Sequence, residues 1–155
     1  MKNIIPLFLV LIALLFSCKP GNEKTSVSEE DTNKTPSIEG VWEMKNQYFF
    51  EDGAVLDSLD YSQGYRQVKM YHQGKIMWSR KVPIDSVEWY GYGTYNITDS
   101  TLQETIEYGS ASMLKIIDTM RVFNFELILD KDTFSQISLD ENGERIFSEN
   151  YVRIE

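Results

Sequence analysis

The sequence predicts an all-β fold made of antiparallel strands. From residue 65 to 108, apolar and polar residues alternate in four consecutive runs with the period of a half-buried strand. Short turns such as Gln73-Gly74 and Asp99-Ser100 separate these runs, and no long helical pattern follows residue 38. A meander of this kind either closes on itself as a barrel or forms two sheets packed face to face.

Length, charge and composition restrict the class of function. The 155 residues are enough for one domain, and a hydrophobic content of 42% allows a real core. The formal net charge of -9 argues against a nucleic-acid partner, which needs a clustered positive surface. Cys18 is the only cysteine and His72 the only histidine, so we expect no disulfide within the chain, no metal site and no cofactor.

The first 37 residues indicate where the protein is located and are not expected to belong to its folded domain. Residues 1–17 combine a basic start with an apolar run that is too short to span a membrane comfortably, as in a signal peptide. The segment ends in Leu15-Phe16-Ser17-Cys18, which resembles the bacterial lipobox and implies lipidation of Cys18. The alternative is an ordinary secretory signal with an incidental cysteine. Residues 18–37 are polar and predict a flexible tether. Lipidation of Cys18 implies a location at the cell envelope, anchored to the outer membrane on either its periplasmic or its surface face.

The folded domain is predicted to span residues 38–155. Its first strand runs from Ile38 to about Phe50, and Glu51–Gly64 is predicted to be a loop with one helical turn around Val55–Leu59. The residues between 110 and 120 fit either a short helix or an irregular strand. The remaining predicted strands are Tyr65–His72, Lys75–Val82, Val87–Thr98, Thr101–Tyr108, Arg121–Asp130, Thr133–Asp140 and Arg145–Ile154, which brings the total to about eight.

Two motifs at the ends of this domain suggest a family. Gly40-Val41-Trp42 resembles the Gly-x-Trp that opens the first strand of lipocalins, and Arg153 resembles their late arginine that packs over that tryptophan. With the lipobox and the meander, the chain resembles bacterial lipocalin-like lipoproteins of the Bacteroidota. The resemblance implies an antiparallel up-and-down β-barrel of about eight strands whose open end holds a small apolar ligand. The short domain and the missing helix after the barrel imply a shallow barrel or a lumen filled by side chains.

Strand parity places candidate ligand-binding residues in the lumen. If Val68 and Met70 face inward, Arg66 and His72 do so too, and an inward Trp78 brings Arg80 with it. An inward Leu102, Ile106 and Tyr108 likewise bring in Glu104, so that Arg80 and Glu104 could meet as an ion pair. A bulge or strand twist would turn either residue outward. The candidate ligand-binding residues are Arg66, Met70, Trp78, Arg80, Glu104 and Phe125, with Arg66 or Arg80 meeting the polar group of a ligand.

No residue pattern supports catalysis. Glu104 and Glu107 lie three positions apart on opposite faces of a strand, so they cannot flank one glycosidic bond, and His72 sits beside a turn. The sequence therefore favours a non-catalytic, lipid-anchored envelope protein that binds a small hydrophobic or amphipathic ligand. The alternative is a filled barrel that contacts another envelope protein through its surface or the Glu51–Gly64 segment. In both cases Trp42 and Arg153 are expected to close one end of the barrel by cation–π contact.

Overall fold

The computed structural model describes residues 36–60, 64–84 and 87–155. The predicted signal peptide, Cys18 and nearly all of the predicted tether lie outside this part of the chain. The described residues form a sheet of nine antiparallel strands in the order β2-β1-β3-β4-β5-β6-β7-β8-β9, which confirms the predicted all-β fold. The strands are β1 (Gly40–Glu51), β2 (Ala54–Asp60), β3 (Arg66–His72), β4 (Lys75–Lys81), β5 (Trp89–Ile97), β6 (Thr101–Gly109), β7 (Val122–Leu129), β8 (Thr133–Leu139) and β9 (Arg145–Arg153).

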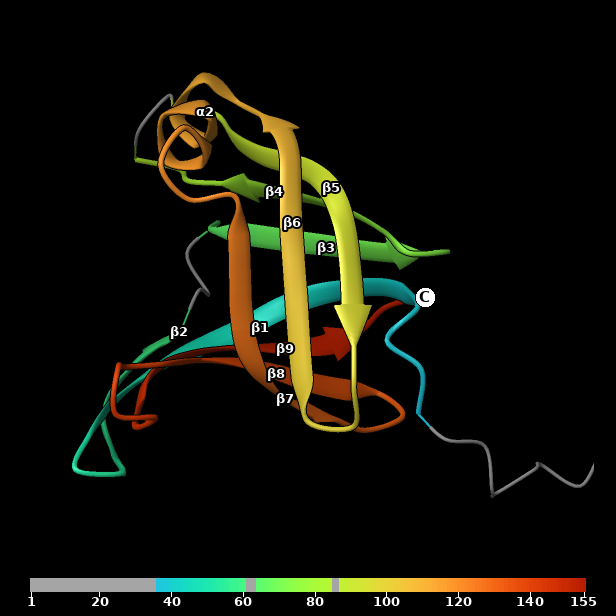
Figure 1. Cartoon of the computed structure of the whole chain (residues 1–155). Coiled ribbons are helices and arrows are strands. Elements are labelled where there is room, and N and C mark those ends of the chain that lie inside the picture. The colour runs from blue at the N-terminus through green and yellow to red at the C-terminus, as the bar shows by residue number, and fades with distance from the viewer. Residues whose placement is uncertain (1–35, 61–63, 85–86) are drawn as a thin grey trace, which may run out of the picture. The chain divides into compact units, whose positions relative to one another are not determined.

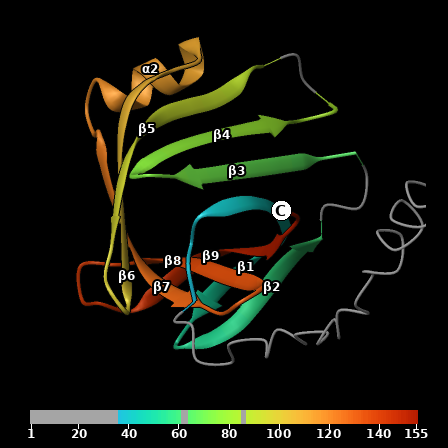
Figure 2. The same cartoon turned by 90° about the vertical axis from the view of Figure 1, so that its right-hand side faces the viewer.

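The long strand β1 closes the sheet into a barrel-like ring (Figure 1). It pairs with β9 from Trp42 to Phe49, and it also pairs first with β3 and then with β2. Since β1, β3 and the six following strands complete the ring, β2 is an additional edge strand. A helix, α2 (Ala111–Ile117), connects β6 to β7 and contacts β5 and β6, away from β2 in both views (Figure 2).

The structure corrects one prediction from the sequence and resolves one alternative that the sequence left open. The predicted Glu51–Gly64 loop with a helical turn is wrong, because residues 54–60 form β2. Asp52 and Gly53 both have positive φ angles, of 49° and 76°, and this two-residue turn brings the chain back along β1 as a hairpin. The ambiguous segment after residue 110 is a helix, which begins where the Ser110 hydroxyl accepts a hydrogen bond from the Met113 backbone N–H.

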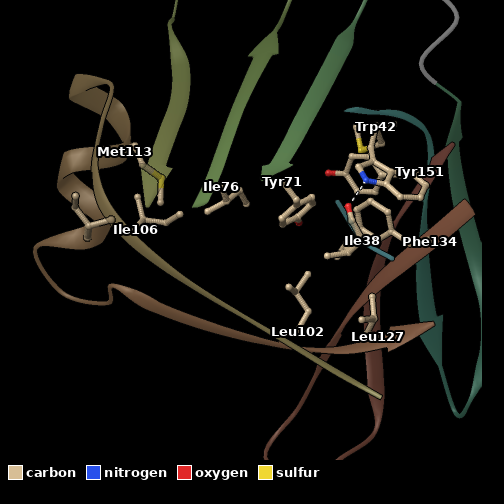
Figure 3. Close-up of a cluster of buried hydrophobic side chains, with 12 residues drawn as sticks. Ile38, Trp42, Tyr71, Ile76, Leu102, Ile106, Met113, Leu127, Phe134 and Tyr151 are labelled. Carbon is tan, nitrogen blue, oxygen red and sulfur yellow. Dashed lines mark hydrogen bonds between the residues drawn. The ribbon is translucent and has the colours of Figure 1, made fainter. Parts of the chain in front are cut away.

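The apolar core fills one end of the ring and continues toward α2. Trp42 is fully buried, and its ring lies edge-on to Phe134, 4.9 Å between centroids, while Phe134 stacks on Tyr151 at 4.5 Å. Trp42 and the α2 residue Met113 lie at opposite ends of the buried cluster (Figure 3). The lumen is therefore filled by side chains at the end that contains Trp42.

Arg153 covers this filled end, and the predicted contact with Trp42 is present. The guanidinium carbon lies 4.0 Å from the centroid of the Trp42 ring. The same guanidinium donates hydrogen bonds to the carbonyl oxygens of Ser37, Glu39 and Lys131 at 2.6–2.8 Å. It thus ties the chain before β1 to the turn between β7 and β8.

Gly40 is required for this arrangement. Its φ angle is +135°, and a Cβ at this position would lie 2.4 Å from Nη1 of Arg153. Any other residue would be strained and would push the guanidinium off the Trp42 ring. The Gly-x-Trp motif therefore has a steric reason within this chain.

We expect Arg153→Met to lower the free energy of unfolding by about 2–3 kcal/mol, because the variant loses the cation–π contact and leaves three carbonyl groups without their donor. Urea unfolding followed by circular dichroism measures the loss. The matched control is Arg121→Met, since Arg121 is exposed and donates to the single carbonyl of Glu107. Equal losses in the two variants would contradict the role assigned to Arg153.

Candidate functional site

A pocket of about 230 Å³ lies in the ring next to α2. Its apolar lining consists of Trp78, Trp89, Ile106, Met113, Ile116, Phe123, Phe125 and Phe147. Its polar lining consists of Gln67, Lys69, Arg80, Glu104, Gln136, Ser138 and Glu149. The pocket therefore combines aromatic and aliphatic walls with a group of charged and amide side chains.

The register of the β3–β4 hairpin decides which side chains reach the pocket. Gln73 and Gly74 form a two-residue turn with positive φ angles, and the following pairs include Lys69 with Trp78 and Gln67 with Arg80. Because directly opposed residues share a face of the sheet, all four point into the ring. The Trp78 indole fits there because its β5 partner is Gly91, where a Cβ would lie only 2.7 Å from the indole nitrogen.

Glu149 is the hub of the polar lining. Its carboxylate accepts hydrogen bonds from Gln47, Gln67, Arg80, Gln136 and Tyr151, at distances between 2.6 and 3.3 Å. A carboxylate has about four lone-pair positions, so these five donors saturate it. Glu149 therefore anchors the neighbouring strands that carry its five donors.

A second carboxylate, Glu104, is paired with Lys69 at 2.8 Å. Both residues are only 3% exposed, and Glu104 also accepts a hydrogen bond from the Tyr71 hydroxyl at 2.5 Å. Lys69 donates in addition to Gln136, and its ammonium lies 5.9 Å from the centroid of the Phe125 ring. The formal charges of the lining cancel, because the carboxylates of Glu104 and Glu149 balance the cations of Lys69 and Arg80.

The two buried phenols of this group stay protonated over a wide pH range. Burial raises the pKa of Tyr71 well above its ordinary value of 10.0, and the negative charge of Glu104 raises it further. Burial and the charge of Glu149 raise the pKa of Tyr151 in the same way. Both hydroxyl groups are therefore hydrogen-bond donors to the carboxylates.

Four of the candidate residues identified from the sequence line the pocket, and two do not. Trp78, Arg80, Glu104 and Phe125 belong to its lining. Met70 is on the outer surface and is 41% exposed. Arg66 is also outside, with 59% of its side chain exposed, and pairs with Glu43.

The inward parity assigned to β3 was therefore wrong, and so was the inward position of His72 on the same strand. Val68 and Met70 suggested an apolar inner face, but the face of β3 that looks inward carries Gln67, Lys69 and Tyr71. Burial of Gln67 and Lys69 on this face is stable because they donate hydrogen bonds to the carboxylates of Glu149 and Glu104.

Two further expectations are corrected. Arg80 and Glu104 both line the pocket but do not pair, since Arg80 bonds to Glu149 at 2.9 Å and Glu104 to Lys69. Tyr108 was expected to face inward but is 55% exposed. On β6, Ile106 pairs with Gly93 and Tyr108 with Tyr92, so Glu107 between them has no opposite residue on β5. This bulge reverses the alternation after Ile106.

The hub residue Glu149 was missed, although the sequence contained a signal for it. Arg153 was expected to pack over Trp42 inside the barrel, and alternation along the same strand then places Tyr151, Glu149 and Phe147 inward as well. Gln136 was missed as well, although alternation along residues 133–140 places it on the same face as Phe134, and its bonds to Lys69 and Glu149 stabilise it there.

The described residues contain neither a metal-binding cluster nor a membrane-spanning helix. In this part of the chain, no group of three or more histidine, cysteine, aspartate or glutamate side chains could hold a metal ion. Within the same residues, no helix has the length and apolar character needed to cross a membrane.

Comparison with known proteins gives little beyond a distant structural similarity. No family model and no curated protein matches the chain. The chain is similar to the crystal structure of an uncharacterized protein from Bacteroides eggerthii, with 13% sequence identity and a TM-score of 0.49. The similarity covers 76% of this chain and 99% of that chain.

We expect Lys69→Met to lower the free energy of unfolding by about 3–5 kcal/mol, because it leaves the buried Glu104 carboxylate without a counter-charge. In the double variant with Glu104→Gln, the loss should be smaller by about 1 kcal/mol or more, since the unpaired charge is then removed. Urea unfolding of the two single variants and the double variant measures the coupling. Strictly additive losses would contradict the buried pair.

The raised pKa values of Tyr71 and Tyr151 predict loss of stability in alkali. Above pH 10 the unfolded chain loses these two protons while the folded chain retains them, so the free energy of unfolding falls as pH rises. Each phenol contributes a slope of about 1.4 kcal/mol per pH unit. Urea unfolding between pH 9 and 11 should show a shallower fall for Tyr71→Phe than for Tyr108→Phe, in which an exposed phenol is removed. The same slope in both variants would refute this assignment.

Proposed function

We propose that this chain is a non-catalytic binding protein that holds a small hydrophobic or amphipathic ligand in the pocket beside α2. The observation that carries the proposal is the lining itself, in which five aromatic rings stand next to a compact polar group. Ligand sites commonly combine apolar walls with a few convergent polar side chains. The cavity volume of about 230 Å³ is below the usual range for drug-sized molecules, so the proposed ligand is small.

The absence of catalysis is part of the proposal. Glu149 is saturated by five donors, and Glu104 is held by Lys69 and Tyr71. A general acid or base needs a proton position that is open toward the ligand, and the contacts of Glu149 leave no such position. These contacts favour a structural role for the carboxylates over acid–base chemistry.

The proposed location is the cell envelope, with the chain anchored by lipid on Cys18 and the folded residues held near the membrane by the polar segment that follows. The support is the Leu15-Phe16-Ser17-Cys18 pattern after a short apolar run. A diacylglycerol on the thiol and an acyl chain such as palmitate on the amine would together anchor the protein stably, whereas one chain would not.

A second candidate function, an interaction module for another envelope protein, is favoured by one feature of the outer surface. The directly opposed residues Met70, Met77, Tyr92 and Tyr108 form an apolar row across β3, β4, β5 and β6. The Tyr92 and Tyr108 rings stack at 5.1 Å between centroids. If this row contacts a protein, Met77→Glu will abolish co-purification of that partner, whereas changes in the pocket will leave it intact.

Native mass spectrometry of the full chain, purified gently from its own host, tests the binding function. We expect a non-covalent small molecule to co-purify, and its mass to be absent from an Ile116→Trp variant. Ile116 lies on α2 and lines the pocket, so the larger side chain fills the space that the ligand would occupy.

Leu114→Trp is the matched control, because Leu114 lies on the same helix, is exposed and is not part of the pocket lining. It should retain the ligand. Retention by Ile116→Trp, or an empty chain together with no binding of added hydrophobic probes, would overturn the proposed function.

A further inference from the structure

The charges of the pocket are already balanced within the protein. Lys69 pairs with Glu104 at 2.8 Å and Arg80 with Glu149 at 2.9 Å. Among the described residues, every buried side-chain nitrogen or oxygen atom has a hydrogen-bond partner. The pocket therefore offers a ligand no charge that is not already balanced within the protein.

An ionised ligand would disturb this balance in either sign. A carboxylate that approached Arg80 would meet a guanidinium whose charge Glu149 already balances, and it would come close to a second negative charge at Glu104. An ammonium would approach Lys69 and Arg80, while Glu149 is saturated by five donors and the charge of Glu104 is already balanced by Lys69. Burial of a charge without a partner is strongly unfavourable, so both kinds of ligand are disfavoured.

We propose that the pocket selects uncharged ligands with an apolar body and one neutral hydrogen-bonding group, such as a hydroxyl or carbonyl. This inference rests on the proposed binding function and names its ligand class. Arg80 is the most accessible charged side chain of the lining, with 28% of it exposed. Its bonds to Gln67 and Glu149 use Nε and Nη2, and a guanidinium has five N–H donors, so it can also donate to a neutral oxygen.

The walls fit the apolar part of such a ligand. Trp78, Trp89, Phe123 and Phe125 stand around the polar group, and aromatic rings bury large apolar areas without needing a charged partner. A neutral head can therefore approach Arg80 while the body contacts the rings. The chemistry differs from that of a fatty-acid carrier, in which an arginine neutralises the ligand carboxylate.

The test compares three probes of equal chain length: 1-octanol, octanoate and octylamine. Binding to the purified full chain is followed at pH 7 by the fluorescence of tryptophan, since Trp78 and Trp89 line the pocket. We expect 1-octanol to bind at least tenfold more tightly than either charged probe. Octanoate or octylamine binding as tightly as the alcohol would overturn the inference and leave the binding function intact. Binding of none of the three would overturn both.

Charge variants test the cause of the preference. Glu149→Gln leaves the pocket with one excess positive charge, so octanoate should gain at least tenfold relative to 1-octanol. Arg80→Gln leaves one excess negative charge and should favour octylamine by a similar factor. Arg66→Gln is the matched control on the outer surface and should leave the order of the three probes unchanged.

Circular dichroism establishes that each variant is folded. Should Glu149→Gln fail to fold, Arg80→Gln decides, because the Arg80 side chain is partly exposed and its removal leaves Glu149 bound to four other donors. An unchanged order of affinities in folded Arg80→Gln would overturn the inference.

Discussion

The hydrogen bonds of the Glu149 carboxylate hold opposite walls of the ring together. Gln47 on β1, Gln67 on β3, Arg80 on β4, and Gln136 and Tyr151 on β8 and β9 all donate to it. These strands come from both ends of the sequence, and only the closure between β1 and β9 makes them neighbours. A carboxylate buried without these donors would be strongly unfavourable, so closure of the sheet and burial of Glu149 depend on each other.

The interior of the ring has two regions with different uses. On one side the lumen is filled by Trp42, Phe134 and neighbouring apolar side chains, and Arg153 covers that end. On the other side the interior remains open as the pocket beside α2. The sequence left open whether the lumen is filled or empty, and the structure contains one region of each kind. Glu149 and its donors Gln67, Arg80 and Gln136 line this pocket, whereas its donor Tyr151 belongs to the buried cluster, so the hydrogen-bonded group connects the two regions.

The sequence predicted the fold well and the site only in part, for identifiable physical reasons. Alternation and two-residue turns are local signals, so eight of the nine strands could be recognised from them, and β2 was missed although Asp52-Gly53 is itself a hairpin turn. Inward residues on β4 and β7, such as Trp78 and Phe125, followed from apolar alternation. Lys69 and Gln136 were not recognised, because both are polar and the partners that stabilise their burial lie far away in the sequence, although the turn at Gln73-Gly74 with an inward Trp78 already placed Lys69 inward.

The error on β3 shows which constraint outweighs side-chain hydrophobicity. The two-residue turn at Gln73-Gly74 fixes the pairing of β3 with β4, and an inward Trp78 then forces Lys69 inward and Met70 outward. A slip by one residue would bury Val68 and Met70, yet it would expose Lys69 and Gln67 and leave Glu104 and Glu149 short of partners. Losing the buried Lys69–Glu104 pair and the hydrogen bond from Gln67 to Glu149 costs more than burying two apolar side chains gains. The turn and the buried Lys69–Glu104 pair therefore favour the same register of β3, which the hydrophobic pattern alone would misplace.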